Sequence, residues 1–126
     1  MEHPELDTLR NIATALPDVT ERVSHGAPCF YVSRKALAYF HSTSRLSLWC
    51  PVGGDYQTMK LFARPDRFFS PATSQSGHFR DWLGMYLDDI AGEPPDWAEV
   101  RAVLIHAFCR IASKRQRARL QDSADG

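Results

Sequence analysis

His25 and Cys29 are the residues whose types and spacing come nearest to a catalytic arrangement. A cysteine acts as a nucleophile only where a base or positive charge stabilises its thiolate, and a histidine nearby in the chain could do this. However, Cys29, Cys50 and Cys109 all lie in apolar stretches, which is typical of reduced thiols packed in a core. Three is also an odd number for a disulfide framework. We therefore predict no catalytic residue, and this pair is the only starting point for an enzyme.

Metal and cofactor motifs do not match the chain. The five histidines and three cysteines form no CxxC or HxxxH pair. Gly53-Gly54 lacks both the Lys-Ser/Thr of a phosphate-binding loop and the third glycine of a dinucleotide-binding turn. Carboxylates crowd between residues 88 and 99, but acids at a loop and a helix start have local structural uses. We predict no metal and no cofactor.

Basic residues alternate with aromatic ones in the middle of the chain and continue in the C-terminal tail. Nucleic-acid sites combine cations that contact phosphates with planar side chains that contact bases. Alternatively, the aromatic side chains form the core and the arginines its solvated surface. We predict weak, salt-dependent binding of nucleic acid, with DNA as the expected partner. Seven residues should form the contacts: Arg34, Lys35, Arg64, Arg67, Arg80, Lys114 and Arg115.

A pocket for a small molecule or a protein is the second hypothesis. Aromatic and histidine side chains flank the two glycine-containing turns, and ligand pockets are typically aromatic with a few polar groups. The residues expected to line the pocket are His25, Phe30, Tyr39, Trp49, His78 and Trp82.

The distribution of charge leaves both hypotheses open. The chain has 126 residues and a formal net charge of zero, so no overall field attracts it to nucleic acid or to an anionic membrane. Residues 22–80 nevertheless carry eight basic residues against Asp55 and Asp66, and residues 100–126 carry six against Asp122 and Asp125. A basic surface forms only if these two segments meet in space.

Hydrophobic periodicity predicts one α+β domain over residues 1–113, in the order α-β-β-β-α-β-β-α, with helices packed on an antiparallel sheet. We expect helices over 4–16, 55–63 and 97–113, the last capped by Asp96 with Glu99 in a capping box. Residues 29–50 should form a three-stranded meander, and 67–72 and 82–87 a pair of strands. We expect an irregular connection over 17–28 and a frayed basic tail over 114–126.

The beginning of the chain has no basic segment followed by an apolar one, and no apolar run is long enough to cross a membrane. Together with the free cysteines, this predicts a cytoplasmic protein that has no contact with a membrane.

Several ordered segments resemble the MmcQ/YjbR family of small bacterial proteins. They are ALPDVTERVSHGAPCFYVSRKALAYF at residues 15–40, Asp66 to Pro71, GHFRDWLG at 77–84, Leu87-Asp88, Asp96 to Val100, and Ala112-Ser113-Lys114-Arg115. The resemblance implies an α+β fold related to double-wing DNA-binding and secretion-chaperone-like architectures, and a DNA-binding label without established catalytic residues. Ser113 replaces a common proline, and Asp81 stands where glycine often precedes the tryptophan.

Overall fold

A computed structural model describes residues 3–71 and 79–125, with the side chains of residues 122–125 left out of the description. Its elements in chain order are α1 (Pro4–Thr14), β1 (Val19–Ser24), β2 (Ala27–Val32), β3 (Lys35–His41), β4 (Ser47–Pro51), α2 (Gly54–Ala63), β5 (Phe68–Phe69), β6 (Trp82–Tyr86), α3 (Trp97–Ile111) and α4 (Lys114–Asp125). This arrangement confirms the α+β class and the single domain with one antiparallel sheet.

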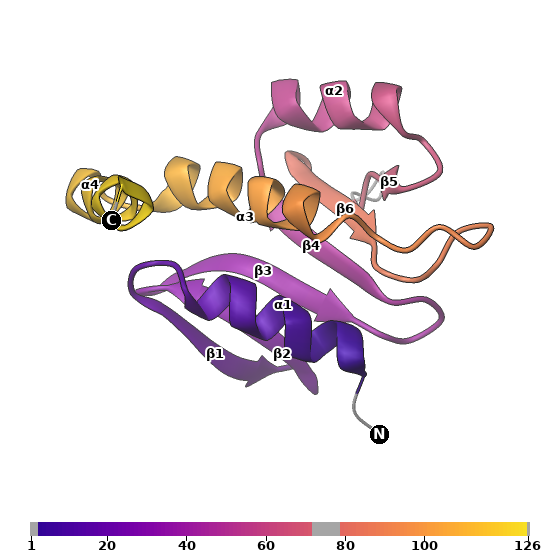
Figure 1. Cartoon of the computed structure of the whole chain (residues 1–126), viewed down its shortest axis with the longest axis horizontal. Coiled ribbons are helices and arrows are strands. Elements are labelled where there is room, and N and C mark those ends of the chain that lie inside the picture. The colour runs from indigo at the N-terminus through magenta and orange to yellow at the C-terminus, as the bar shows by residue number, and fades with distance from the viewer. Residues whose placement is uncertain (1–2, 72–78, 126) are drawn as a thin grey trace.

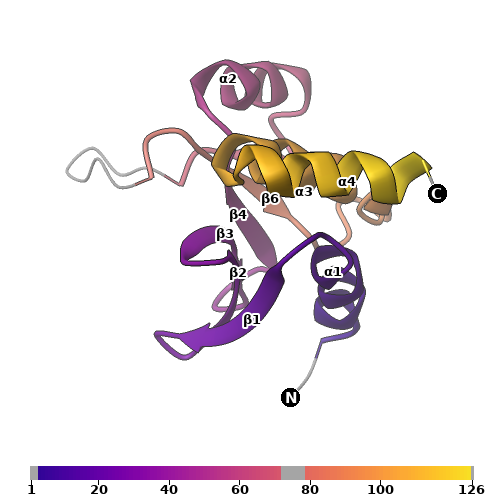
Figure 2. The ribbon, with the colours of Figure 1, turned by 90° about the vertical axis from the view of Figure 1, so that its left-hand side faces the viewer.

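The six strands form one sheet in the order β1-β2-β3-β4-β6-β5, and all neighbouring pairs are antiparallel. α1 and α3 pack on one face of this sheet (Figure 1), and α4 lies on the same side (Figure 2). α2 lies beyond the end of the sheet, and none of its residues is fully buried. On the opposite face of the sheet, the described part of the chain places no helix.

Two neighbouring rows of residues across the sheet face opposite sides. One row runs across β3, β4, β6 and β5, where each residue is the register partner of the next: Phe40, Leu48, Met85 and Phe68. All four are buried in the core beneath the helices. The adjacent row is Cys29, Tyr39, Trp49, Gly84 and Phe69, which side-chain alternation places on the other face. We call this helix-free side the open face.

α3 follows the prediction closely. The Asp96 side chain accepts hydrogen bonds from the backbone N–H groups of Ala98 and Glu99, at 3.0 and 3.4 Å. The Glu99 carboxylate does not complete a capping box, because it pairs with the Lys60 ammonium at 3.0 Å instead. Val100, Leu104 and Phe108 are buried on one side of the helix, as the apolar spacing predicts.

The connection over 17–28 is not irregular, because β1 forms within it and pairs with β2. His25 and Gly26 make the tight turn with φ values of 52° and 80°. Positive φ at both central residues is the geometry of a type I′ hairpin turn, in which glycine is common and histidine is less expected. The mixed polar sequence of β1 hides it, because as an edge strand it buries none of its residues fully.

The tail is also not frayed. Ser113 and Gln116 form a capping box in which each side chain accepts a hydrogen bond from the other residue's backbone N–H, at 3.1 and 2.8 Å. Leu120 is buried against the core cluster. The serine that replaces the proline expected at position 113 therefore caps α4, and the domain extends beyond residue 113.

No helix within the described residues is long and apolar enough to cross a membrane.

Candidate ligand-binding cleft

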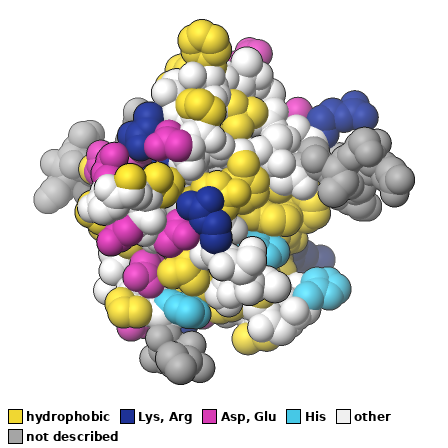
Figure 3. Space-filling model, turned by 90° about the vertical axis from the view of Figure 1, so that its right-hand side faces the viewer, with side chains coloured by type: hydrophobic (Ala, Val, Ile, Leu, Met, Phe, Trp, Pro, Cys, Tyr) yellow, Lys and Arg dark blue, Asp and Glu magenta, His cyan; other side chains and the backbone are white. Residues whose placement is uncertain are grey.

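The open face carries a cluster of aromatic rings in mutual contact. Trp82 stacks on Tyr39 with a centroid distance of 5.1 Å. Phe79 meets Trp82 and Trp49 edge to face, at 5.0 and 5.3 Å. These rings are half-buried, so they stay partly accessible to solvent or to a ligand. Figure 3 views the molecule from the right-hand side of Figure 1, at one end of the sheet, and shows hydrophobic side chains gathered on that surface with histidines beside them.

Gly84 allows the cluster to extend across the sheet. A Cβ atom at this position would lie 2.3 Å from the Phe69 ring, so any side chain would push that ring away. Phe69 lies over the bare backbone of β6 and stacks on Tyr86 at 4.5 Å. Glycine at this position therefore lets the ring lie directly against the strand.

A concave site of about 470 Å³ opens beside these rings, and we call it the sheet cleft. Its aromatic walls come from Tyr39, Trp49 and Phe79, and Cys29 lies among them. The rest of its lining comes from the β1–β2 turn and from the end of β3 with the two residues that follow: Ser24, His25, Gly26, Ala27, His41, Ser42 and Thr43. A mostly apolar concavity with a few polar groups is typical of small-molecule sites.

His41 is the polar side chain of the sheet cleft with an unmet hydrogen-bonding group. Its ring lies on Trp49 at a centroid distance of 3.9 Å, and its Nε2 atom is buried without a partner in the described part of the chain. Burial lowers the pKa of His41 below its ordinary value, which favours the neutral imidazole near pH 7. The same side chain lines a smaller hollow of about 240 Å³ beside Phe69 and Tyr86.

Cys29 does not have the surroundings of a nucleophile. It is 3% exposed, and desolvation raises the pKa of its thiol. The thiol donates a weak hydrogen bond to the Ala27 carbonyl at 3.6 Å. A catalytic cysteine needs a stabilised thiolate, so this burial removes the starting point for an enzyme based on His25 and Cys29.

The structure brings together part of the pocket that the sequence predicts. His25, Tyr39 and Trp49 line the sheet cleft, and Trp82 supports it by stacking on Tyr39. Phe30 was placed on the wrong face: it is fully buried on the helix side, because neighbouring strand residues point in opposite directions. His78 lies outside the described residues.

Sequence reasoning missed His41 and Phe79 as lining residues. His41 could have been found from strand alternation, since it is two residues beyond Tyr39 on β3 and therefore shares its face. Phe79 lies between strands, where no periodicity indicates its direction.

Of the seven basic residues expected to contact nucleic acid, Arg67 is excluded. Its side chain is 2% exposed, and its guanidinium donates hydrogen bonds to the carbonyls of Tyr86, Asp88 and Glu93 at 3.1, 2.6 and 2.9 Å. Three carbonyls in a loop can bind a planar guanidinium, and sequence spacing gives no sign of this arrangement.

Arg64 and Arg80 lie in segments that flank β5, apart in the chain from the tail. The Arg64 guanidinium is paired with the carboxylates of Asp66 and Glu93, at 3.0 and 3.4 Å, which compensates its charge. Arg80 is exposed and directly follows Phe79 in the chain, between β5 and β6.

The segment that holds Arg34 and Lys35 meets the segment that holds Lys114 and Arg115. The Lys35 ammonium donates a hydrogen bond to the Ile111 carbonyl at the end of α3, at 3.2 Å. A hollow of about 420 Å³ is lined by Arg34 and Lys35 on one side and by Ser113 and Gln116 on the other. The middle basic segment and the tail therefore meet at the β2–β3 turn. We call these four residues the terminal basic cluster.

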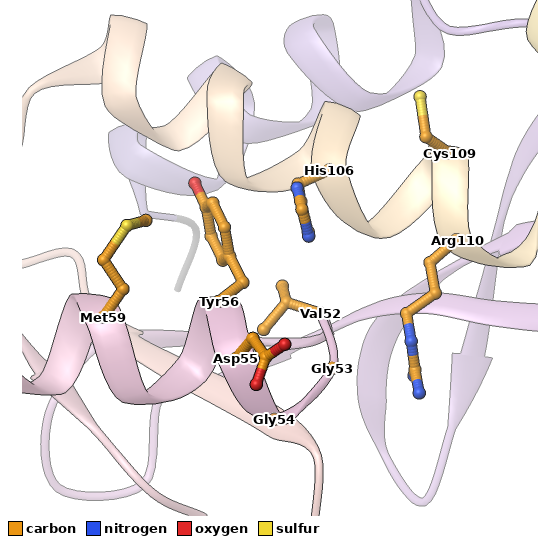
Figure 4. A pocket seen from close by; sticks show the side chains of 9 residues that line it. All are labelled: Val52, Gly53, Gly54, Asp55, Tyr56, Met59, His106, Cys109 and Arg110. Carbon is orange, nitrogen blue, oxygen red and sulfur yellow. The ribbon is translucent and has the colours of Figure 1, made fainter.

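A second, larger concavity of about 790 Å³ lies between the beginning of α2 and α3 (Figure 4). Tyr56 stacks on His106 across it, with a centroid distance of 3.9 Å. Arg110 lies against Gly53 and pairs with Asp81 at 3.7 Å. The two rings of this larger concavity already stack on each other, and its arginine already pairs with a carboxylate. We therefore consider the sheet cleft the better ligand site.

The described residues contain no group of three His, Cys, Asp or Glu side chains that could hold a metal ion.

Comparisons with known proteins support the fold. No protein-family model matches the sequence, and no curated protein matches it. The crystal structure of the Deinococcus radiodurans protein DR2400, a DUF419 domain, is similar with a TM-score of 0.68 and 20% sequence identity. The alignment covers 96% of this chain and 92% of that one. At this identity the likeness shows a common fold for the whole chain and leaves the function open.

Proposed function

We propose that this protein is a non-catalytic binding domain that takes a small organic molecule in the sheet cleft. The observation that carries the proposal is the convergence of Tyr39, Trp49 and Phe79 with the unpartnered His41 in one concavity on a helix-free sheet face. Aromatic walls supply most of the contact area for a small ligand, while a few polar groups fix its orientation.

A screen of small aromatic compounds by thermal denaturation and ligand-observed NMR tests this function. Thr43 lines the mouth of the cleft and is exposed, so Thr43→Trp should fill the cleft without disturbing the core. Compounds that bind the wild-type chain should lose at least about tenfold in affinity for this variant, which corresponds to ~1.4 kcal/mol.

Phe62→Ala is the matched control. Phe62 is 91% exposed on α2, away from the sheet cleft, so its removal deletes a surface aromatic without touching the site. Retained binding by Thr43→Trp, or equal loss in both variants, would contradict the proposal.

Nucleic-acid binding is the second candidate function, and the terminal basic cluster favours it. The four cations come from two separate segments and are exposed, and two of them line a hollow. We also propose on the sequence motifs that the chain is a bacterial, cytoplasmic member of the MmcQ/YjbR family, whose DNA-binding label agrees with this function. Arg67 has no part in it, and Arg64 is already paired.

Fluorescence anisotropy with labelled duplex DNA, single-stranded DNA and RNA at two salt concentrations tests this second function. Binding through phosphates should weaken linearly with the logarithm of salt concentration, and Arg34→Glu with Arg115→Glu should abolish it. The control is Arg64→Glu, which leaves the cluster intact. Unchanged binding by the double variant would refute the assignment.

A further inference from the structure

The lining of the sheet cleft is free of formal charge. Among the described residues that form it, none is Asp, Glu, Lys or Arg. An ionised group loses hydration when it enters such a site and finds no counter-ion to compensate. The sheet cleft therefore disfavours phosphorylated or carboxylated ligands in spite of the chain's other basic residues.

The shape of the lining indicates a flat ligand. Tyr39 and Phe79 meet edge to face at 6.0 Å, and Trp49 meets Phe79 in the same way. Rings held in this manner present both faces and edges, and aromatic ligands gain contact with either. Their packing against one another and against Trp82 keeps them in place before a ligand arrives.

The polar groups lie together at one side of the cleft. Hydroxyls of Ser42 and Thr43 follow His41 directly in the chain, and all three line the site. His41 lines both the sheet cleft and the neighbouring hollow, and its Nε2 atom is enclosed, so the ring must rotate before a ligand can reach this nitrogen. A ligand with a polar edge would supply the hydrogen bond that this nitrogen lacks.

We infer that the sheet cleft binds an uncharged, flat aromatic molecule with one hydrogen-bonding edge, and that His41 determines specificity by contacting this edge. The inference rests on the proposed function and adds the chemical class of the ligand. Because His41 is neutral near pH 7, it can form a hydrogen bond with the ligand without introducing a charge into the site.

Three probes with the same ring system separate these features: naphthalene, 2-naphthol and 2-naphthoate. Their affinities would be measured by quenching of tryptophan fluorescence and by NMR titration at pH 7.5. We expect 2-naphthol to bind at least about tenfold more tightly than 2-naphthoate, because only the second carries a charge into the cleft.

His41→Phe tests the specificity residue, since it keeps a ring on Trp49 and removes the nitrogen atoms. The ratio of 2-naphthol to naphthalene affinity should fall about fivefold in this variant, the effect of one ordinary hydrogen bond. His41→Gln, which restores a hydrogen-bonding group, should recover part of the ratio and also serves if the phenylalanine variant does not fold. Phe62→Ala should leave all three affinities unchanged.

The outcomes separate the two proposals. Binding of 2-naphthoate as tight as that of 2-naphthol would overturn the neutral class of ligand. An affinity ratio that does not depend on residue 41 would overturn its role. If none of the three probes binds the wild-type chain, the proposed function itself fails, and the inference fails with it.

Discussion

On the face of the sheet that α1 and α3 cover, Phe40, Leu48 and Met85 are at most 2% exposed, whereas on the open face Tyr39, Trp49 and Phe69 are half-buried. Tyr39 and Phe40 are immediate neighbours on β3, and Leu48 and Trp49 are immediate neighbours on β4. The apolar side chains on the helix side are buried completely, whereas those on the open face are covered in part, mainly by contacts between rings. The difference indicates that stability resides mainly on one face, which leaves the other available for a ligand.

The largest effect should come from the helix-covered face. Phe40→Ala removes a ring that is fully enclosed by the core, so we expect it to lower the free energy of unfolding by about 3–5 kcal/mol. Tyr39→Leu, one residue earlier, should cost less because its ring is only half-buried. Urea denaturation monitored by circular dichroism measures both. Equal losses would show that the two faces do not differ in this way.

Arg67 provides the next largest effect. Arg67→Met leaves the carbonyls of Tyr86, Asp88 and Glu93 without their donor, and it should cost about 2–4 kcal/mol. Arg64→Met removes an exposed ion pair, so its effect on the free energy of unfolding should be much smaller than that of Arg67→Met. Similar stabilities of the two variants would contradict a structural role for Arg67.

Gly84→Ala tests how the open face is built. The added methyl group must displace the Phe69 ring, and we expect a loss of about 1–3 kcal/mol. The ring signals of Phe69 and Tyr86 in NMR spectra should move, while those of Phe108 on the helix side should not. Gly92→Ala is an informative control for backbone strain alone, because Gly92 has a φ of 86° and no atom within 4 Å of an added Cβ.

The smallest effect concerns pH. Burial lowers the pKa of His41 in the folded chain below the ordinary value of 6.5. The unfolded chain therefore takes up this proton first as pH falls, so folding loses stability from about pH 7 downward until the lowered pKa is passed. His41→Phe removes this contribution. Stability curves between pH 7.5 and 5 should then show a smaller decrease in the variant than in the wild-type chain, and parallel curves would contradict the burial of a neutral ring.

Much of the fold could be predicted because the local signals agree with the packing. The stripe from Val100 to Phe108 and the cap at Asp96 define α3 without reference to any other element. The alternation of Leu46, Leu48 and Cys50 likewise identifies β4. Such elements carry their own pattern of burial, which sequence periodicity records directly.

The errors arise where a contact distant in sequence decides the outcome. β1 exists because β2 pairs with it, and α4 is fixed in part by Leu120 against the core. Arg67 is buried because loop carbonyls far along the chain surround its guanidinium. Tyr39 and Trp49 of the candidate site could be predicted from residue types. The assignment of Phe30 to the site failed because residue type does not determine which face of a strand a side chain occupies.

The most direct test of the account is a titration of the ¹⁵N-labelled protein with 2-naphthol, followed through the indole N–H signals of its three tryptophans. Trp49 and Trp82 belong to the open face, and Trp97 begins α3 on the other side. The account predicts saturable shifts for Trp49 and Trp82 with Trp97 unchanged. Shifts confined to Trp97 or to the backbone signals of Tyr56 and His106, or no shifts at all, would contradict it.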